Sequence, residues 1–151
     1  MNLEAKRMEF DLIELTTKND IIQTYEIYKA CIFMPTAEKF NKKVDKFLSD
    51  NSIKIFACLY GNEVKGIIVV SFTEQYKIEI IGIAVNVTAR HLGIGSYMIN
   101  KLIDDYSLVS VYAETDNDAV EFYRKNGFKI TEFSNTFDGE TVIRYNCELS
   151  K

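Results

Sequence analysis

The spacing of apolar residues divides the chain into short strands and helices. Apolar residues that alternate with polar ones, or form short runs, predict strands at residues 8–16, 53–60, 64–73, 78–85, 108–114 and, twice, within 129–149. Apolar residues three or four positions apart predict helices at residues 21–32, 36–48, 93–106 and 117–125. Three hairpin-linked strands followed by a helix, a strand and another helix favour a mixed sheet with helices packed on its faces.

Cap and turn residues mark several boundaries of these elements. Thr17-Lys18-Asn19-Asp20 has the spacing of a capping box at the start of the first helix. Gly61-Asn62 and Asp138-Gly139 are turn dipeptides between predicted strands. The length of 151 residues suits one domain, and we therefore expect a single α/β (α+β) domain over residues 1–151.

The balance of charged residues disfavours some classes of binding partner and favours others. The chain has 18 basic and 22 acidic residues, a formal net charge of −4. A nucleic-acid-binding protein usually carries a basic excess, so this class is disfavoured. A mildly acidic surface weakly favours a cationic substrate such as an amine. An anionic cofactor stays compatible with this balance, because backbone amides can bind phosphate locally.

The cysteines and the N-terminal residues indicate in which cellular compartment the protein is expected. Cys31, Cys58 and Cys147 are odd in number and far apart, which argues against a disulfide framework or a zinc site and favours buried thiols in a reducing cytoplasm. Residues 1–7 carry charges where a signal peptide has an apolar run, and no stretch approaches the roughly 18 apolar residues of a membrane span. We expect a cytoplasmic protein with no membrane contact and no metal.

The most informative segment joins an apolar strand to an amphipathic helix. Gly93 and Gly95 open the helix, and Arg90 precedes them in the pattern Arg-x-x-Gly-x-Gly. A helix N-terminus has unpaired N–H groups that suit phosphate. A Walker loop has no counterpart in the sequence, and the third glycine of a dinucleotide fingerprint is replaced by Met98. The segment therefore predicts an anion site of another kind.

A second motif follows one helix and one strand later. Residues 113–128 contain Ala-x-x-Phe-Tyr-x-x-x-Gly-Phe, which begins at Ala119 and ends at Phe128. Together the two motifs resemble the GNAT acetyltransferase superfamily over about residues 60–130. The resemblance implies a GNAT-like, mostly antiparallel mixed sheet of about seven strands with about four helices on its faces.

The resemblance also implies where acetyl-CoA binds. The pyrophosphate is expected on the backbone amides of the loop Arg90, His91, Leu92, Gly93, Ile94, Gly95 and Ser96. The pantetheine arm is expected beside the strand residues Ile83, Ala84 and Val85. In this arrangement the N–H of Val85 would polarise the thioester carbonyl. His91 is the only histidine, and the family gives its position no catalytic role.

The resemblance further implies the groups that move protons. Tyr123 is expected to protonate the departing thiolate, and the alternative is a tyrosine that only packs on the sheet. Glu79 is a candidate general base, expected by strand alternation to share a face with Ile81, Ile83 and Val85. A surface ion pair with Lys77 is the alternative. Glu114 is a second candidate base, and many relatives use no single side-chain base.

Two positions depart from the family pattern. Asn117 is expected to contact the pantetheine, but it stands only two residues before Ala119, and Asp116 holds the usual place. Both residue types also serve as helix N-caps, so the choice between them stays open. Val87 stands where relatives often have proline.

The sequence thus predicts an N-acetyltransferase that joins the acetyl group of acetyl-CoA to a primary amine by direct attack. The alternatives are a non-catalytic module that senses acyl-CoA and a structural interaction domain. No recognisable motif in the sequence identifies the acceptor amine. Its binding site is expected around residues 32–40 and 135–140. A homodimer through the C-terminal strands is compatible with the pattern.

Overall fold

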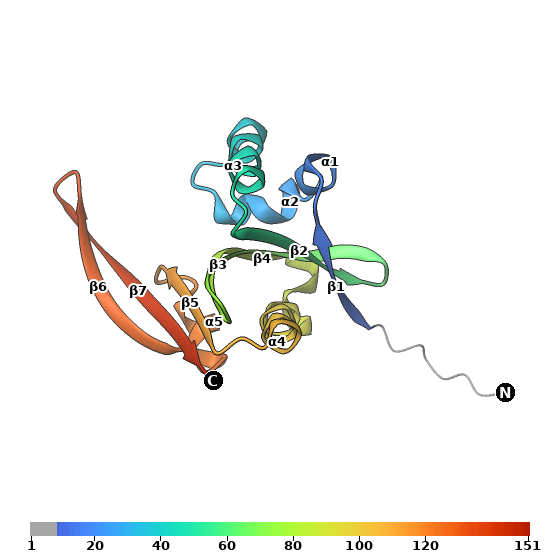
Figure 1. Cartoon of the computed structure of the whole chain (residues 1–151). Helices are drawn as coiled ribbons and strands as arrows, with labels where there is room; N and C mark the ends of the chain where they lie inside the picture. Colours follow the sequence, from blue (N-terminus) through green and yellow to red (C-terminus); the bar gives the residue numbers. More distant parts are fainter. Residues whose placement is uncertain (1–8) are drawn as a thin grey trace.

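The structure is a computed structural model that describes residues 9–151. Within these residues one sheet contains the strands β1 Phe10–Leu15, β2 Ile53–Tyr60, β3 Glu63–Glu74, β4 Lys77–Val85, β5 Ser110–Thr115, β6 Lys129–Phe137 and β7 Glu140–Ser150. Their order is β1-β2-β3-β4-β5-β7-β6, and only β4 and β5 pair in parallel (Figure 1). The predicted mixed, mostly antiparallel sheet of about seven strands is confirmed. Met8 and the charged residues 1–7 lie outside the described residues.

The helices of residues 9–151 are more finely divided than the sequence predicts. Five are α-helices, α1 Lys18–Ile22, α2 Tyr25–Tyr28, α3 Ala37–Ser49, α4 Ile94–Tyr106 and α5 Val120–Lys125, and two are 3₁₀ helices, η1 Lys29–Cys31 and η2 Val87–Leu92. The helix predicted over residues 21–32 breaks because the Ile21 carbonyl accepts hydrogen bonds from both Thr24 N (3.0 Å) and Thr24 Oγ1 (2.7 Å). None of these described helices is long and apolar enough to cross a membrane.

The helices cover the two faces of the sheet and enclose a core on each. α1, α2 and α3 lie on one face, called here the α3 face, and α4 lies on the other, the α4 face (Figure 1). Phe40 and Val44 anchor α3 in its core, and Met98 and Ile99 anchor α4 in the other. α2 also comes very close to β4, because a Cβ on Gly82 would lie 2.9 Å from two carbons of the Tyr28 ring.

β4 carries an irregularity that shapes the rest of the molecule. It pairs with β3 up to Val85, but Val69 pairs with Gly82 while Val70 pairs with Ile80, so Ile81 is an extra, unpaired residue. The parallel pairing with β5 ends at the same level, at the pair Ile80–Ala113. Beyond this bulge, no strand within residues 9–151 pairs with the edge of β4 that faces β5. We call this region the β4–β5 gap.

Candidate active site

The loop after β4 leads into α4 through a residue with left-handed backbone conformation. Asn86 Oδ1 accepts hydrogen bonds from Thr88 N (3.0 Å) and Thr88 Oγ1 (2.8 Å), which starts η2. Gly93 ends η2 with φ 80° and ψ 21° and precedes Ile94, the first residue of α4. The first backbone hydrogen bond of α4 joins Tyr97 N to Gly93 O at 3.0 Å. The N–H groups of residues 94–96 precede it and have no partner within the helix, as at any helix start, which makes them candidates to bind an anion.

The two glycines of this loop are required for different reasons. A Cβ on Gly93 would meet nothing within 4 Å, but its positive φ disfavours other residues. A Cβ on Gly95 would lie 2.8 Å from a ring carbon of Phe122, so Gly95 lets α5 pack against the start of α4. The side of Gly93 where a Cβ would stand is therefore open, and Gly93 directly precedes the free amides of residues 94–96.

The side chains of the loop are either exposed or packed in the core. Arg90 is exposed, and its Nε donates to the Val85 carbonyl at 3.2 Å. His91 is exposed as well. Leu92 packs against the core of the α4 face, and Ile94 is buried. Arg90 thus ties the loop to the end of β4, and the backbone amides are the groups of the loop that remain as candidates to bind a ligand.

The edge of β4 at the gap presents the backbone of two residues. Asn86 N–H donates to Lys65 O at 2.7 Å, so the backbone of Asn86 faces β3. By strand alternation, Ile83 and Val85 turn their N–H and C=O groups the other way, toward the gap. Ala84 turns its backbone to β3 and its side chain into the core of the α3 face.

Cys31 of η1 also lies at this edge. Its Sγ donates to the Ile83 carbonyl at 3.4 Å. Burial raises the pKa of the Cys31 thiol to about 11, so the group stays a thiol at neutral pH. The contact fixes the chain after α2 beside the β4–β5 gap. No sequence signal singles out this role, because it depends on a contact between residues 52 positions apart.

Tyr123 lies on the α4 face with its ring buried and its hydroxyl available. The ring packs on Phe128 at a centroid distance of 5.1 Å. Burial raises the pKa of Tyr123 well above its usual value, and the thiols of Cys147 and Cys31 add to the effect. Among residues 9–151 every fully buried side-chain N or O atom has a hydrogen-bond partner. Because the Tyr123 hydroxyl has none in this part of the chain, its oxygen is not fully buried, although the residue is only 5% exposed.

Glu79 does not lie where strand alternation predicts. The core of the α4 face includes Ile80 before the bulge and touches Ile83 and Val85 after it, so the bulge at Ile81 reverses the alternation. The expectation that Glu79 shares a face with Ile83 and Val85 is therefore wrong. Glu79 is half-buried on the α3 face, opposite the α4-face core.

Glu79 has a tyrosine, not a lysine, as its neighbour. It pairs across the sheet with Tyr112 of β5. Lys77, the alternative partner, forms an ion pair with Glu74 at 3.5 Å. The Tyr112 hydroxyl donates to Asn146 Oδ1 at 2.6 Å. The sequence does not point to Tyr112 as a site residue, although Tyr112 lies on the same strand as Glu114, two residues before it.

Glu114, the second candidate base, is already paired. Its Oε1 lies 3.4 Å from Arg144 Nε of β7. Burial raises the pKa of Tyr112, and the carboxylates of Glu114 and Glu79 add to the effect. The two carboxylates therefore flank Tyr112 on the α3 face, and Glu79 has no ion pair within residues 9–151.

Asp116 and Asn117 have distinct partners. Asp116 Oδ1 accepts from the backbone N–H groups of Asp118 (3.0 Å) and Ala119 (3.1 Å). This turn delays α5, which begins at Val120 instead of at residue 117 as predicted. Asn117 Oδ1 accepts from the Tyr145 hydroxyl at 3.0 Å, so its amide nitrogen is the group left for a ligand. Asp116 thus caps the turn that precedes α5, whereas Ala119, the N-cap of α5 itself, makes no side-chain hydrogen bond.

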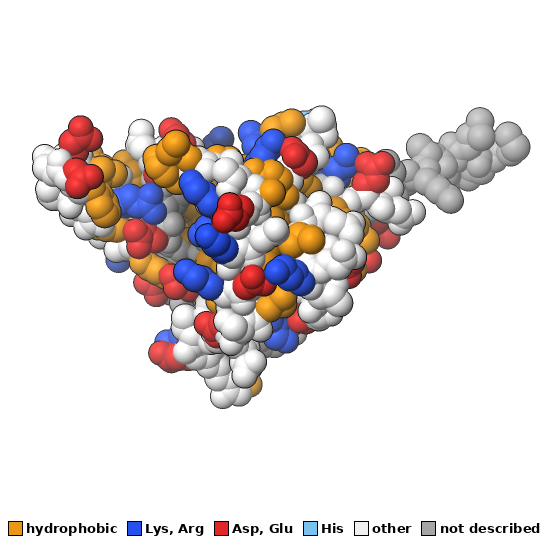
Figure 2. All heavy atoms as spheres, turned by 90° about the horizontal axis from the view of Figure 1, so that it is seen from above, with side chains coloured by type: hydrophobic (Ala, Val, Ile, Leu, Met, Phe, Trp, Pro, Cys, Tyr) orange, Lys and Arg blue, Asp and Glu red, His pale blue; other side chains and the backbone are white. Residues whose placement is uncertain are grey.

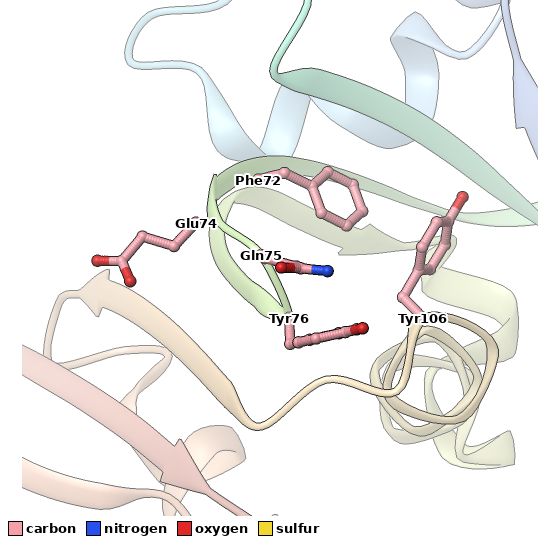
Figure 3. Close-up of a pocket in the computed structure, with 5 residues that line it drawn as sticks. All are labelled: Phe72, Glu74, Gln75, Tyr76 and Tyr106. Atoms are coloured by element: carbon pink, nitrogen blue, oxygen red, sulfur yellow. The ribbon is translucent and has the colours of Figure 1, made fainter.

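A pocket of about 490 Å³ lies at the opposite end of β4 and α4 from Gly93. Its lining is largely aromatic and consists of Phe72, Glu74, Gln75, Tyr76 and Tyr106 (Figure 3). Lys54 Nζ lies 5.9 Å from the Phe72 ring centre and 5.5 Å from that of Tyr106. This pocket is therefore separate from the loop and the gap. Among residues 9–151 no group of three or more His, Cys, Asp or Glu side chains is arranged to hold a metal ion.

Comparisons with known proteins bear on the family and the fold of the chain. The model of the GNAT acetyltransferase family matches residues 21–128. A comparison with curated protein sequences gives no match. A GNAT-family protein from Desulfovibrio desulfuricans superposes with a TM-score of 0.73 at 15% identity, over 94% of this chain and 99% of the other.

Two further solved structures share the fold. An N-acetyltransferase from Staphylococcus aureus has a TM-score of 0.69 at 19% identity, over 94% of this chain and 98% of that one. A GNAT acetyltransferase from Elizabethkingia anophelis with acetyl-CoA bound has a TM-score of 0.63 at 18% identity, with the same coverage of 94% and 98%. The family match spans more than two thirds of the sequence, and the chain belongs to the GNAT acetyltransferase family.

Proposed function

We propose that this chain transfers the acetyl group of acetyl-CoA to a primary amine. The observation that carries the proposal is that the start of α4, with its free amides, follows the open edge of β4. The free amides of residues 94–96 suit a diphosphate, and the edge of β4 at Ile83 and Val85 suits the amide groups of a pantetheine arm. The Elizabethkingia anophelis relative, which has this fold, holds acetyl-CoA.

Each part of the donor has a candidate partner in this chain. The loop from Arg90 to Gly93 places the α4 amides, and the open space beside Gly93 leaves room for the diphosphate. The N–H groups of Ile83 and Val85 would pair with the pantetheine arm as a neighbouring strand does. The amide nitrogen of Asn117 is a further candidate contact for the arm.

The chemistry needs positioning and two proton transfers. The amine nitrogen attacks the thioester carbonyl carbon, so that a C–N bond forms and the C–S bond breaks. The N–H of Val85 faces the gap, where it can stabilise the negative charge that develops on the carbonyl oxygen. Tyr123 gives its proton to the departing sulfur and regains one from solvent, and the raised pKa keeps the phenol protonated beforehand. The proton of the amine passes to Glu79, directly or through water.

We expect Glu79→Gln to lower kcat/KM for an amine by about tenfold. Glutamine keeps the size of the side chain but accepts no proton. The loss is modest because Glu79 is half-exposed, so water can replace part of its role. Initial rates of thiol release from acetyl-CoA with a saturating amine would measure it.

Glu114→Gln is the matched control for this substitution. Glu114 lies on the same face but already has Arg144 as a partner, so we expect a change of less than about twofold. If Glu114→Gln lowered kcat/KM and Glu79→Gln did not, the roles of the two carboxylates would be reversed. If neither did, the reaction would use no side-chain base.

A further inference from the structure

The pocket at the C-terminal end of α4 has walls of one chemical kind. Its volume of about 490 Å³ is within the roughly 300–1,000 Å³ of small-molecule sites. Phe72, Tyr76 and Tyr106 line it with aromatic rings, and Glu74 and Gln75 complete the lining. The α3 face of the molecule instead mixes Lys and Arg with Asp and Glu side chains (Figure 2). No step of the proposed acetyl transfer involves this pocket.

The walls of the pocket are held in place by contacts within the chain. The rings of Phe72 and Tyr106 pack with their centres 5.0 Å apart, and Phe56 meets the Tyr106 ring edge to face at 6.1 Å. The Tyr76 carbonyl accepts a hydrogen bond from Val109 N at 2.8 Å, which ties the turn between β3 and β4 to the start of β5. The pocket is therefore largely preorganised, and a ligand would have to order few groups.

Tyr76 lines the pocket from a strained backbone conformation. Its φ of 63° lies in the left-handed region, which disfavours bulky side chains. The other two hairpin turns have Gly61-Asn62 and Asp138-Gly139 in this region, and these residue types suit it. Tyr76 is also 47% exposed, so packing within the chain offsets little of the strain. A large ring kept at such a position indicates a contact outside the chain.

The rings and the Gln75 amide surround one space. In Figure 3 the Gln75 amide points toward Tyr106, with the Phe72 ring on one side of it and the Tyr76 ring on the other. Gln75 is exposed, and within residues 9–151 its amide makes no hydrogen bond to another residue. Its N–H donors and its carbonyl acceptor are therefore both available to a ligand in this space.

The charges around the pocket disfavour an ionic ligand. Lys54 Nζ already lies 5.9 Å from the Phe72 ring centre and 5.5 Å from that of Tyr106, so it would repel a second cation on these rings. The Glu74 carboxylate is turned away from the rings in Figure 3 and pairs with Lys77 at 3.5 Å. An anion would find no basic residue among the five that line the pocket. The lining thus favours an uncharged ligand.

The Gln75 amide narrows the choice among uncharged ligands. An apolar molecule that covered this amide would leave its donor and acceptor without water, which is unfavourable. A primary amide can instead form two hydrogen bonds with a ring edge that has an acceptor beside a donor, as glutamine does with adenine. Flat rings also stack on aromatic side chains. These properties together describe a flat, uncharged heteroaromatic ring.

We propose that the pocket lined by Phe72, Gln75, Tyr76 and Tyr106 binds an uncharged purine nucleoside, with its base packed on the aromatic rings and hydrogen-bonded to the Gln75 amide. The 13 residues of α4 place this site about 20 Å from the free amides at the start of that helix. The purine is thus a second ligand, and its binding does not depend on acetyl transfer.

The test titrates adenosine into the full chain with excess acetyl-CoA present, so that a donor site is already filled. Two-dimensional NMR follows the backbone amide signals. We expect the signals of Gln75, Tyr76 and Tyr106 to shift together, with a Kd of about 0.1–1 mM. Purine riboside, which lacks the 6-amino donor, should bind about tenfold more weakly.

Three results would overturn the assignment. The first is no shift of these three signals at about 10 mM adenosine. The second is tighter binding of tetramethylammonium at the same residues, which would make the pocket a cation site. The third is binding of adenosine 5′-monophosphate about tenfold or more tighter than adenosine, which would make it an anion site. If acetyl-CoA did not bind, the proposed function would fail, and the same three signals would still decide whether adenosine binds here.

Tyr76→Asn removes the ring without disturbing the turn, because asparagine suits the left-handed region. We expect adenosine to bind at least about tenfold more weakly to this variant, with little change in its unfolding by urea. Met34→Asn is the matched control, since Met34 is also a bulky residue at positive φ (47°), is 68% exposed and lies outside the pocket. Wild-type affinity in Tyr76→Asn, or an equal loss in both variants, would contradict the proposal.

Discussion

Replacing Tyr123 with phenylalanine is expected to lower kcat by about 100-fold while the affinity for acetyl-CoA changes little. The substitution removes one hydroxyl and leaves the ring, which packs on Phe128 in the core of the α4 face. Without the phenol, the departing thiolate must take its proton from water. The raised pKa of Tyr123 means that the wild-type phenol is protonated at neutral pH, so the loss should be present throughout that range.

Tyr106→Phe is the control for the loss of a hydroxyl. Tyr106 ends α4, far along that helix from Gly93, and lines the pocket at the opposite end of β4. Steady-state kinetics of thiol release, with unfolding by urea as a check on stability, should show an unchanged kcat for this variant. Full activity of Tyr123→Phe at every pH tested would remove the proposed acid.

Replacing Gly93 with alanine is expected to weaken acetyl-CoA binding by about 10- to 100-fold. Gly93 has φ 80°, a conformation that costs other residues about 1–2 kcal/mol. The added Cβ would also enter the open space beside Gly93, where the proposed function puts the diphosphate. Loss of one or two charge-assisted hydrogen bonds accounts for the expected range.

Gly139→Ala separates backbone strain from ligand contact. Gly139 has φ 79° in the β6–β7 turn, and a Cβ there also meets nothing within 4 Å. Both variants should therefore lose a similar free energy of unfolding, measured with urea. Calorimetry should show weaker acetyl-CoA binding in Gly93→Ala alone. An equal loss of affinity in both variants would mean that the effect comes from general destabilisation.

The sequence predicts the strands well because their signals are local. Alternation of apolar residues and the turn residues Gly61-Asn62 and Asp138-Gly139 place β2, β3, β6 and β7 within a few residues of the structure. The loop that carries Gly93 and Gly95 is predicted between a strand and a helix for a similar reason, because the strand, the glycines and the helix follow one another in the sequence. Thr17 caps α1 as expected, with its Oγ1 accepting from Asp20 N at 3.2 Å.

The errors come from features that the local pattern does not record. Ile81 sits in an uninterrupted apolar run, so nothing in the sequence marks it as an extra residue, and this reverses the predicted face of Glu79. Thr24 breaks the first helix because its hydroxyl donates to the Ile21 carbonyl. Threonine has a weak helix preference, and whether its hydroxyl makes such a bond depends on the surrounding structure. Cys31 and Tyr112 reach the site through contacts between distant segments, which no spacing rule can predict.

The most direct test of the proposed function is calorimetric titration of the wild-type protein with acetyl-CoA. The amides at the start of α4 and the open edge of β4 predict one site per chain, with a dissociation constant between about 1 µM and 1 mM. No binding at millimolar acetyl-CoA would contradict the proposal, and would make the loop before α4 a structural turn in a GNAT fold that has another use.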